Sequence, residues 1–512
     1  MSTQSLNNNK RIAKNTLLLY LRMIILLFVS LYTSRVVLQT LGVVDYGIYN
    51  VVGGVVAMFA FLNGAMAGAT QRYLNFSLGK NNKKELNEIF CTSVIIHFLI
   101  AVTVIILAET IGLWFMFNKM VIPADRFDAA FWVFQCSMLA MVINMMSVPY
   151  NAVIIAHEKM GAFAYISLLE AFFKLLIVYL LMISSWDKLK LYSFLLLLVS
   201  ISIRMIYSNY SKRHFAETKF SLIIDKPKIK EMGLFACWNL VGNLALMGVT
   251  QGLNMVLNVF FGPIVNAARG VAVQVQGVVQ QFATNLQMAM NPQITKSYAC
   301  GDMDYLCDLV CSSSKYSFFL VYFLSLPIMI MTDQILDYWL VTPPAYSATF
   351  LRLILMCILI DSMSNSLGTT ISSSGKIRKY QLINGLTMLS ILPISIILLN
   401  ICKNPALVFI VQFTITLCAH FLKLYFASQY SNLTLTVFFR QVYTRIVAVT
   451  IVSAIAPIIV YNTVNRNFLT FVFSGIICML SVLLTVFLLG MKKSERKILY
   501  GRIGVLKSKF HI

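Results

Sequence analysis

Side-chain amides at helical spacing are the residues of this sequence most suited to binding chemistry. Two hydrophobic segments between Gly233 and Pro292 carry them, and at 100° per residue they fall on one face of each helix. The first face holds Asn239, Asn243, Thr250, Gln251, Asn254 and Asn258. The second holds Arg269, Gln276, Gln280, Thr284, Gln287 and Asn291, and Gln274, Gln281 and Asn285 extend it sideways. A polar face inside a membrane must meet protein or line a wet cavity. These two helices therefore predict a transport path.

Arginines near the predicted outer ends of spans are the cationic candidates. Arg35, Arg269 and Arg352 occupy such positions, against the usual preference for basic residues on the cytoplasmic side. Arg269 shares the amide face, so we expect it to reach the same cavity, where a guanidinium can bind a phosphate oxygen with two bonds. The alternative is that Arg269 extends outward to the membrane surface.

Acidic residues inside spans are the candidates for ion coupling. Glu170 and Lys174 lie four residues apart and share a helix face, so they can neutralise one another as a structural ion pair. The functional alternative is that Glu170 exchanges a proton or Na⁺ during transport. Asp361 has no basic residue at i,i+4 in its own segment, so it needs a partner elsewhere, a bound cation or a proton.

Composition places all of these residues in a polytopic membrane protein. Of the 512 residues, 59% are hydrophobic and 12% charged, and apolar spans of about 20 residues recur from end to end. We expect an all-α chain with about 14 spans. They lie near 16 to 36, 46 to 69, 90 to 115, 128 to 150, 163 to 184, 191 to 210, 233 to 260, 267 to 292, 315 to 334, 348 to 370, 381 to 401, 406 to 428, 442 to 462 and 468 to 490.

The distribution of basic charge predicts the orientation of the chain. With a cytoplasmic N-terminus, most of the 41 Lys and Arg fall in cytoplasmic segments. The outer connections hold only Lys119, Arg126, Lys188, Lys190, Lys403 and Arg466. Both termini are therefore predicted to be cytoplasmic. Topology and anionic membrane lipids then account for the net charge of +22, without nucleic acid as a partner.

Neither the cysteines nor the carboxylates form a recognisable reactive or metal site. Cys300, Cys307 and Cys311 are close in sequence, but no histidine joins them and their spacing also fits one helix face. The sequence contains no paired carboxylates in a large outer loop, no Ser/His arrangement and no phosphate-binding glycine loop. We therefore expect no catalytic residue, no metal and no cofactor other than a coupling H⁺ or Na⁺.

An internal repeat organises the chain into two six-helix lobes. Shifting the sequence by about 220 residues aligns Gly42 with Gly262, Gly79 with Gly301, and the segment starting at Glu158 with that starting at Gly375. Six helices per copy give both lobes the same orientation. The predicted parts are an N-terminal lobe (1–210), a basic cytoplasmic linker (211–232), a C-terminal lobe (233–428), and two extra helices with a basic tail (429–512). Bends are expected at Pro327, Pro393 and Pro457.

Three segments carry a family resemblance. SRVVLQTLGVVDYGIYNVVGGVV from Ser34, AHEKMGAFAYISLLEAFFKLL from Ala156 and SSSGKIRKYQ from Ser372 together resemble the Wzx-like polysaccharide flippases of bacteria. Their superfamily, the multidrug/oligosaccharidyl-lipid/polysaccharide exporters, is built from two six-helix bundles, often followed by two extra helices. The resemblance covers nearly the whole chain, but the family has no strict residue motif for substrate contacts.

The resemblance implies movement of undecaprenyl-diphosphate-linked oligosaccharides, units of O-antigen, capsule or lipopolysaccharide, across the bacterial inner membrane by alternating access. Amides suit sugar hydroxyls because they both donate and accept hydrogen bonds. Membrane lipids and polysaccharide polymerase and chain-length proteins are the expected partners. The expected substrate contacts are Arg35, Asn50, Asn243, Asn254, Asn258, Arg269, Gln276, Gln280, Thr284 and Gln287, with the C-terminal lobe holding more of the sugar.

Three other functions stay open at this point. A drug or cation exporter of the same superfamily would share the fold, but we expect a more aromatic and acidic cavity for organic cations. A lipid II flippase would differ only in its cargo. A membrane glycosyltransferase or polymerase would need a larger outer loop bearing carboxylates, and the predicted outer connections are short.

Overall fold

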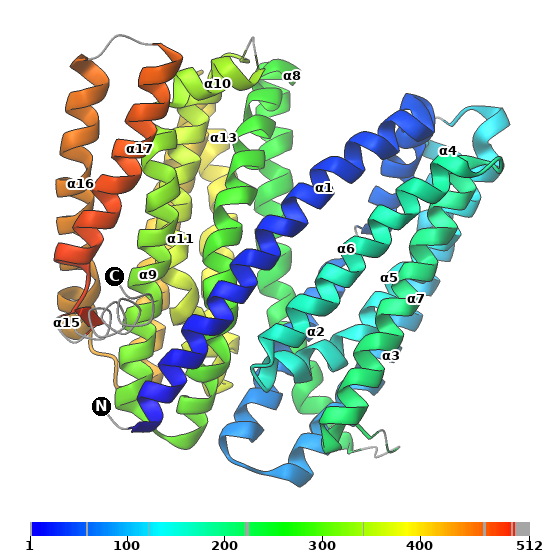
Figure 1. Ribbon diagram of the computed structural model, residues 1–512, viewed down its shortest axis with the longest axis horizontal. Helices are drawn as coiled ribbons and strands as arrows, with labels where there is room; N and C mark the ends of the chain where they lie inside the picture. The colour runs from blue at the N-terminus through cyan, green and yellow to red at the C-terminus, as the bar shows by residue number, and fades with distance from the viewer. Residues whose placement is uncertain are drawn as a thin grey trace, which may run out of the picture. The chain divides into compact units, whose positions relative to one another are not determined.

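The computed structural model describes residues 3–57, 60–120, 122–219, 221, 225–340, 343–463, 467–492 and 495–496. Regular structure within these ranges is helical throughout, with no strand (Figure 1). The expected all-α class is therefore confirmed. The outer basic residue Arg466 and the tail beyond Arg496 lie outside the described residues.

Twelve helices of the described chain are long and apolar enough to cross a membrane. Two predicted spans are not among these twelve. The span near 46 to 69 covers the end of α1 (Thr3–Ala57) and the start of α2 (Ala60–Gly79), and residues 58 and 59 between them lie outside the described residues. The span near 267 to 292 is the amide-rich second arm of α8 (Lys226–Cys300). Amide side chains lower the hydropathy of that arm, although it is as helical as its neighbours.

The chain forms two compact units. The first comprises Met1–Leu244, Asn291–Asp302 and Gly375–Leu382. Besides α1 and α2 it contains α3 (Lys83–Leu107), η1 (Ala108–Gly112), α4 (Leu113–Lys119), η2 (Ala124–Arg126), α5 (Phe127–Ala156), α6 (Met160–Ile183), α7 (Lys188–His214) and η3 (Ala216–Thr218). The predicted lobe and linker boundaries remain predictions.

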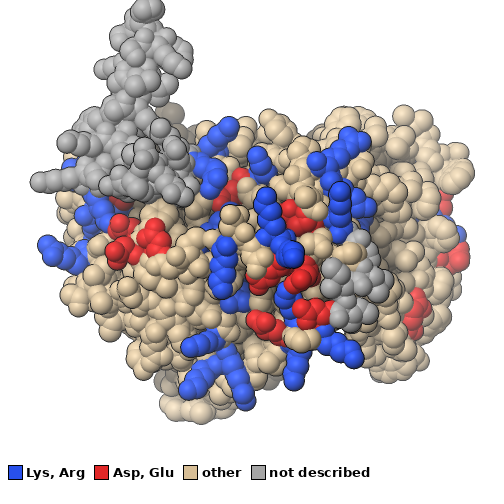
Figure 2. Space-filling view, turned by 90° about the horizontal axis from the view of Figure 1, so that it is seen from below, with Lys and Arg blue, Asp and Glu red and all other residues tan. Residues whose placement is uncertain are grey.

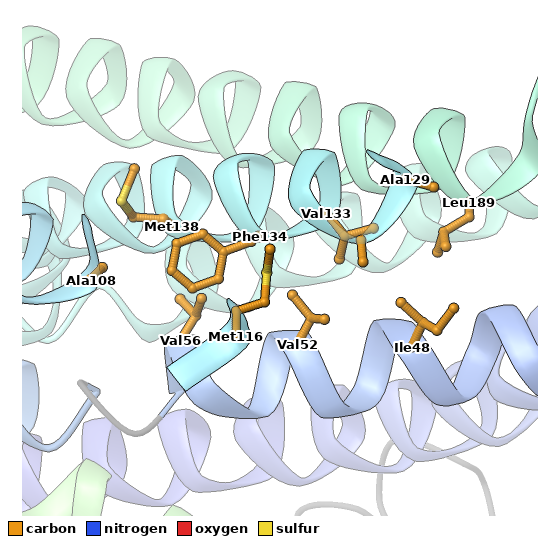
Figure 3. Close-up of a cluster of buried hydrophobic side chains, with 11 residues drawn as sticks. Ile48, Val52, Val56, Ala108, Met116, Ala129, Val133, Phe134, Met138 and Leu189 are labelled. Atoms are coloured by element: carbon orange, nitrogen blue, oxygen red, sulfur yellow. The ribbon is translucent and has the colours of Figure 1, made fainter. Parts of the chain in front are cut away.

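A buried apolar cluster joins five of these elements, α1, η1, α4, α5 and α7. Val52 of α1, Met116 of α4 and Phe134 of α5 meet at its centre (Figure 3). Phe134 is 1% exposed and Met116 is 1% exposed. Burying large side chains stabilises such a packing by about 1.5–3 kcal/mol each in a soluble protein, whereas tight contact is the main gain in a bilayer. This cluster holds α1 and α5 together beside the cavity described below.

The second unit comprises Ala245–Met290, Met303–Ser374 and Ile383–Ile512. Its helices, apart from its share of α8, are α9 (Met303–Ile330), α10 (Thr332–Leu340), α11 (Ser347–Ser374), most of α12 (Arg378–Leu389), α13 (Ile391–Ile401), α14 (Ala406–Tyr430), α15 (Leu435–Phe438), η4 (Phe439–Tyr443), α16 (Thr444–Thr463), α17 (Phe468–Thr485) and η5 (Val486–Gly490). α12 ends at Leu389 and α13 begins at Ile391, just before Pro393. The ring of Pro393 conflicts with the carbonyl of Leu389, four residues earlier. A helix break is thus found at one of the three prolines expected to bend the chain.

Backbone conformation supports the internal repeat. Gly42 in α1 has φ 79° and ψ 168°, and Gly262 in α8 has φ 76° and ψ −171°, so both hairpins turn in the same way. Glu158 (φ 58°) and Gly375 (φ 78°) also share the left-handed region, as the sequence alignment predicts. After α2, however, the left-handed residue is Asn81 (φ 55°), so the match to Gly301 belongs to Asn81 and not to Gly79.

Charged side chains gather at the ends of the helices. The face seen in Figure 2 carries many Lys and Arg side chains with Asp and Glu between them. In the first unit, Lys228 pairs with Glu88, and Lys296 pairs with Glu158 at 2.7 Å. At the other end of this unit, Arg126 bonds Asp45 through Nε at 2.8 Å and Asp187 through Nη1 at 2.6 Å.

Candidate functional site

The amide face of α8 divides into exposed and bonded residues. Gln251, Asn258, Gln274, Gln281 and Thr284 are exposed, whereas Asn243, Asn254, Gln276 and Gln280 are half-buried. A lipid-facing amide has no water with which to bond, so exposed amides on a spanning helix indicate a wet or substrate-filled surface. The exposed amides are thus the part of the predicted stripe that is accessible to a ligand.

Arg269 links the two arms of the α8 hairpin. Its Nη2 donates to the backbone oxygen of Thr250 at 3.0 Å, and its Nη1 donates to Asn254 Oδ1. Asn254 in turn donates to Gln251 Oε1 at 3.3 Å. Arg269 is only 6% exposed, and its Nε makes no hydrogen bond within the described chain. The structure therefore brings Arg269 and Asn254 together, with the guanidinium bonded mainly to the hairpin itself.

Gln287 connects three helices of the second unit. Its Nε2 donates to Ser317 Oγ of α9 at 3.3 Å and to the backbone oxygen of Ser362 of α11 at 3.2 Å. Its Oε1 accepts from Asn365 Nδ2 of α11 at 3.0 Å. Gln287 is 5% exposed, so its amide satisfies protein groups in this conformation. Helix packing accounts for this member of the stripe, while its predicted contact with substrate stays a prediction.

A cavity of about 620 Å³ lies within the first unit. α1, α5, α6 and α7 line it, and its polar lining residues are Tyr49, Ser137, Asn144, Glu170, Lys174, Ser193 and Ser200. This volume falls in the range of small-molecule sites, and hydroxyl, amide and charged groups share the wall with Met, Val and Ile. The cavity can therefore take a ligand with several hydrogen-bonding groups.

The predicted pair of Glu170 and Lys174 forms one wall of this cavity. Lys174 Nζ donates to Glu170 Oε1 at 2.6 Å, and the two side chains remain 48% and 38% exposed for Lys174 and Glu170, respectively. The i,i+4 ion pair is thus confirmed. Because both groups are accessible, water screens their attraction, and the pair adds little to folding stability. Their accessibility leaves Glu170 open to a proton or cation.

The other predicted residues lie apart from these two sites. Arg35 is exposed on α1. Asn50 belongs to α1, but its side chain lies outside the described part of the structure. Asp361 is half-buried on α11, where Lys423 of α14 is the charged neighbour that acts on it.

Sequence reasoning missed several polar residues of the spans. Ser137 and Asn144 in α5, and Ser193 and Ser200 in α7, each lie seven residues apart on one helix face, a spacing that could have revealed the cavity. No sequence signal connects His420 with its partners. Its Nδ1 lies 2.7 Å from Ser364 Oγ and its Nε2 lies 2.5 Å from Tyr443 Oη, forming a buried chain between α11, α14 and η4.

Cysteine and acidic side chains show no metal-binding arrangement in the described ranges. All ten cysteines are free thiols. No group of three or more His, Cys, Asp or Glu side chains in these ranges lies close enough to hold a metal ion.

Comparisons with known proteins give a fold. No protein-family model matches the sequence, and no curated protein matches it. Solved structures do match over most of the chain. One is an outward-facing multidrug resistance MATE family transporter of the MOP superfamily, with a TM-score of 0.69 and 14% identity over 83% of this chain and 96% of that one.

Two more solved structures agree. A MOP superfamily transporter from Pyrococcus furiosus, described as having a binding pocket of reverse polarity, has a TM-score of 0.67 and 13% identity over 82% of this chain and 95% of that one. A MATE protein in the straight conformation has a TM-score of 0.68 and 15% identity over 83% of this chain and 97% of that one. Such identities show the fold alone. The chain is a multi-pass membrane protein with the two-lobed fold of the MATE proteins.

Proposed function

We propose that this protein flips undecaprenyl-diphosphate-linked oligosaccharides across the bacterial inner membrane by alternating access. The exposed amides of α8 are the observation that carries the proposal. Gln251, Asn258, Gln274 and Gln281 present donors and acceptors within a membrane transporter fold. A glycan entering the bilayer would otherwise lose its bonds to water, at several kcal/mol per unsatisfied group. Amides can replace those bonds one for one.

The charged groups suit the remainder of such a substrate. Arg269 retains an unbonded Nε, and Lys174 presents an accessible ammonium in the cavity of the first unit. A diphosphate can approach Lys174 directly and would reach the buried Arg269 only once its hairpin bonds open, while the polyprenyl chain stays in lipid. The proposed orientation has both termini in the cytoplasm, with membrane lipids around the spans and polysaccharide polymerase and chain-length proteins as partners. The glycan then serves the synthesis of capsule or of the O-antigen of lipopolysaccharide.

We further propose that transport is coupled to H⁺ or Na⁺ through Glu170 or Asp361. Glu170 is accessible from the cavity, and Asp361 has Lys423 as its charged neighbour. Flipping itself changes no covalent bond, so the proposal needs no catalytic residue. Export of organic cations is the second candidate, because one matching structure is described as a multidrug resistance transporter. A lipid II cargo would use the same features.

Reconstitution into liposomes tests the proposal. The protein is supplied with defined undecaprenyl-diphosphate oligosaccharides, lipid II and a fluorescent organic cation in separate assays, and an impermeant glycan-cleaving enzyme reports lipid that reaches the outer leaflet. We expect movement of the oligosaccharide lipid. Movement of only the cation or of lipid II would replace the proposal with that alternative, and inactivity toward every oligosaccharide lipid would refute it.

A matched pair of variants tests the role of the amides. Asn258→Leu removes an exposed amide from the α8 face, and loss of one net hydrogen bond of about 1 kcal/mol predicts about fivefold slower flipping. Asn400→Leu is the control, because Asn400 is exposed near the end of α13 and bonds only the Ile396 oxygen of its own helix at 3.0 Å. Equal flipping rates for the two variants would show that the exposed α8 amides do not contact the substrate.

A further inference from the structure

The loop between α5 and α6 places a buried carboxylate at an unusual backbone position. Glu158 has φ 58°, in the left-handed region that a residue with a Cβ rarely adopts. Its counterpart in the second repeat, Gly375, adopts the same region without that conflict. The side chain of Glu158 is fully buried, at 0% exposure. Such strain persists only where the surroundings hold it in place, and it is concentrated at functional positions.

Donors from two distant segments converge on Glu158. Gln293 Nε2 lies 2.7 Å from both carboxylate oxygens, and Lys296 Nζ lies 2.7 Å from Oε1. Both residues belong to the last turns of α8. From α1, Arg11 Nε lies 2.7 Å from Oε2, and Asn15 Nδ2 donates to the backbone oxygen of Glu158 at 3.1 Å. One carboxylate therefore ties the end of α8 to the start of α1.

A second contact holds the same turns of α8. A Cβ on Gly79 of α2 would lie 2.8 Å from Ala299 Cβ and 2.8 Å from the Lys296 backbone oxygen, so only glycine lets the helices approach this closely. Cys300 Sγ also donates to the Gly79 oxygen at 2.8 Å. The segment Asn291–Asp302 is thus attached to the first unit through both polar and packing contacts.

The sequence just before this segment provides a point of bending. Within α8, Ala245–Met290 belongs to the second unit, and the turns from Asn291 onward belong to the first. Pro292 follows directly and has no N–H, so its ring interrupts the helical hydrogen bond to the Met288 carbonyl. The terminal turns can therefore change direction relative to the rest of α8 without breaking a second backbone bond.

We propose that Glu158, Gln293 and Lys296 form a latch that opens once in each transport cycle. The latch, resting on the proposed alternating-access function, is closed in this structure. On opening, Gln293 and Lys296 leave the carboxylate, while Arg11 stays bonded and compensates its charge. The terminal turns of α8 then pivot at Pro292 away from Gly79. Glu158 is a positioning residue in this scheme, since it acts through the helix it holds.

Chemical crosslinking tests the latch without any substrate. Lys80→Cys beside Gly79 is paired with the native Cys300 after the other nine cysteines are replaced by serine, and a short thiol-cleavable bismaleimide joins the pair. Both positions are exposed. We expect efficient crosslinking in the parent and at least a threefold slower reaction with Glu158→Gln. An unchanged rate would overturn the latch.

Two variants separate the latch from a general loss of structure. Glu217→Gln is the matched control, because the Glu217 carboxylate pairs with the neighbouring His157 at 2.5 Å and, among the described residues, makes no hydrogen bond or ion pair with α8. It should leave the crosslinking rate unchanged, and a slowing equal to that of Glu158→Gln would overturn the assignment. If Glu158→Gln does not fold, Lys296→Met removes a donor from the α8 side while Arg11 and Gln293 stay. The same slowing is expected there.

The crosslink also shows whether opening is necessary for transport. Flipping in liposomes should stop when the parent pair is crosslinked and recover when the linker is cleaved. Full transport by the crosslinked protein would overturn the opening step. If no lipid is moved even before crosslinking, the proposed function fails, whereas the substrate-free crosslinking rates still decide whether Glu158 holds the end of α8.

Discussion

The bonds of Arg269 predict a measurable coupling across the α8 hairpin. Arg269→Ala removes the bonds to Asn254 and to the Thr250 oxygen. Side-chain hydrogen bonds in membrane proteins average about 0.6 kcal/mol and reach about 1.7. Bonds to a charged group lie at the upper end of that range. Two such bonds contribute about 3 kcal/mol to the free energy of unfolding. Arg269→Ala also removes the desolvation cost of a buried cation with an unbonded Nε, so we expect the free energy of unfolding to fall by only about 2 kcal/mol.

A double-mutant cycle with Asn254→Ala isolates one of the two bonds. Unfolding in mixed micelles by a denaturing detergent gives the four free energies of unfolding, and the predicted coupling is about 1–2 kcal/mol. Arg269→Lys keeps the charge but loses the planar fork, so it should recover about half of the stability lost in Arg269→Ala. A coupling below about 0.3 kcal/mol would refute the assignment of Arg269 as the link between the arms.

A surface pair supplies the comparison for this cycle. Arg352 Nη2 lies 2.8 Å from Asp333 Oδ2, and the side chains are 38% and 57% exposed for Arg352 and Asp333, respectively. Water screens such a pair, so its coupling should lie between about 0 and 1 kcal/mol and weaken with added salt. Equal coupling in both cycles would mean that burial does not strengthen the bond of Arg269, contrary to the argument above.

Three further predictions concern the Gly262 turn of α8, the carboxylate of Asp187 and Glu170 in the cavity of the first unit. Gly262→Ala should destabilise the protein by about 1–3 kcal/mol because of its φ of 76°. Gly270→Ala, also with open space around a Cβ but with helical φ, should instead stabilise the protein by about 0.4–1 kcal/mol. Burial alone would raise the pKa of Asp187, but the Lys190 N–H and Arg126 hold it below 3.8. The stabilisation by this carboxylate is therefore present above pH 3.8 and is lost as the pH falls through the lowered pKa. Asp187→Asn should cost about 1 kcal/mol at pH 7 in detergent unfolding and progressively less as the pH is lowered below 3.8. Glu170→Gln should lower the rate of transport driven by an imposed H⁺ or Na⁺ gradient in liposomes at least tenfold, while lipid movement down its own gradient continues. An unchanged rate of gradient-driven transport would exclude Glu170 as the coupling group.

The helices of this structure could be predicted from the sequence because the protein spans a bilayer. Every spanning backbone must satisfy its own hydrogen bonds, so apolar length alone predicts the helices. Backbone requirements also survive in the repeat, where Gly42 and Gly262 adopt nearly the same turn. The alignment of Gly79 with Gly301 was wrong, because Gly79 is small for a reason unrelated to its φ. Ala299 and Lys296 pack against it, and the left-handed residue is Asn81.

Side-chain partners were not predictable in the same way. A helical wheel identifies the face that carries Gln287, but it cannot show that Ser362 and Asn365 satisfy that amide from a helix about 75 residues away. The same limit applies to the cavity, whose polar lining is spread over four helices with few polar groups on each. Tertiary packing therefore decides which amides are available to a ligand, and the exposed residues Asn258 and Gln281 become stronger candidates than Gln287.

The differences between the two repeats indicate where function was added to a shared backbone. Both copies need a left-handed residue before the fifth helix, and glycine at 375 meets that need without strain. Glu158 at the equivalent position accepts strain and places a carboxylate among Arg11, Gln293 and Lys296. Glycine would adopt this turn without strain, so the contacts of the carboxylate must offset the strain. The substitution is explained if the carboxylate has a partner that must be held in one state and released in another, which is the role that the last turns of α8 fulfil in the proposed latch.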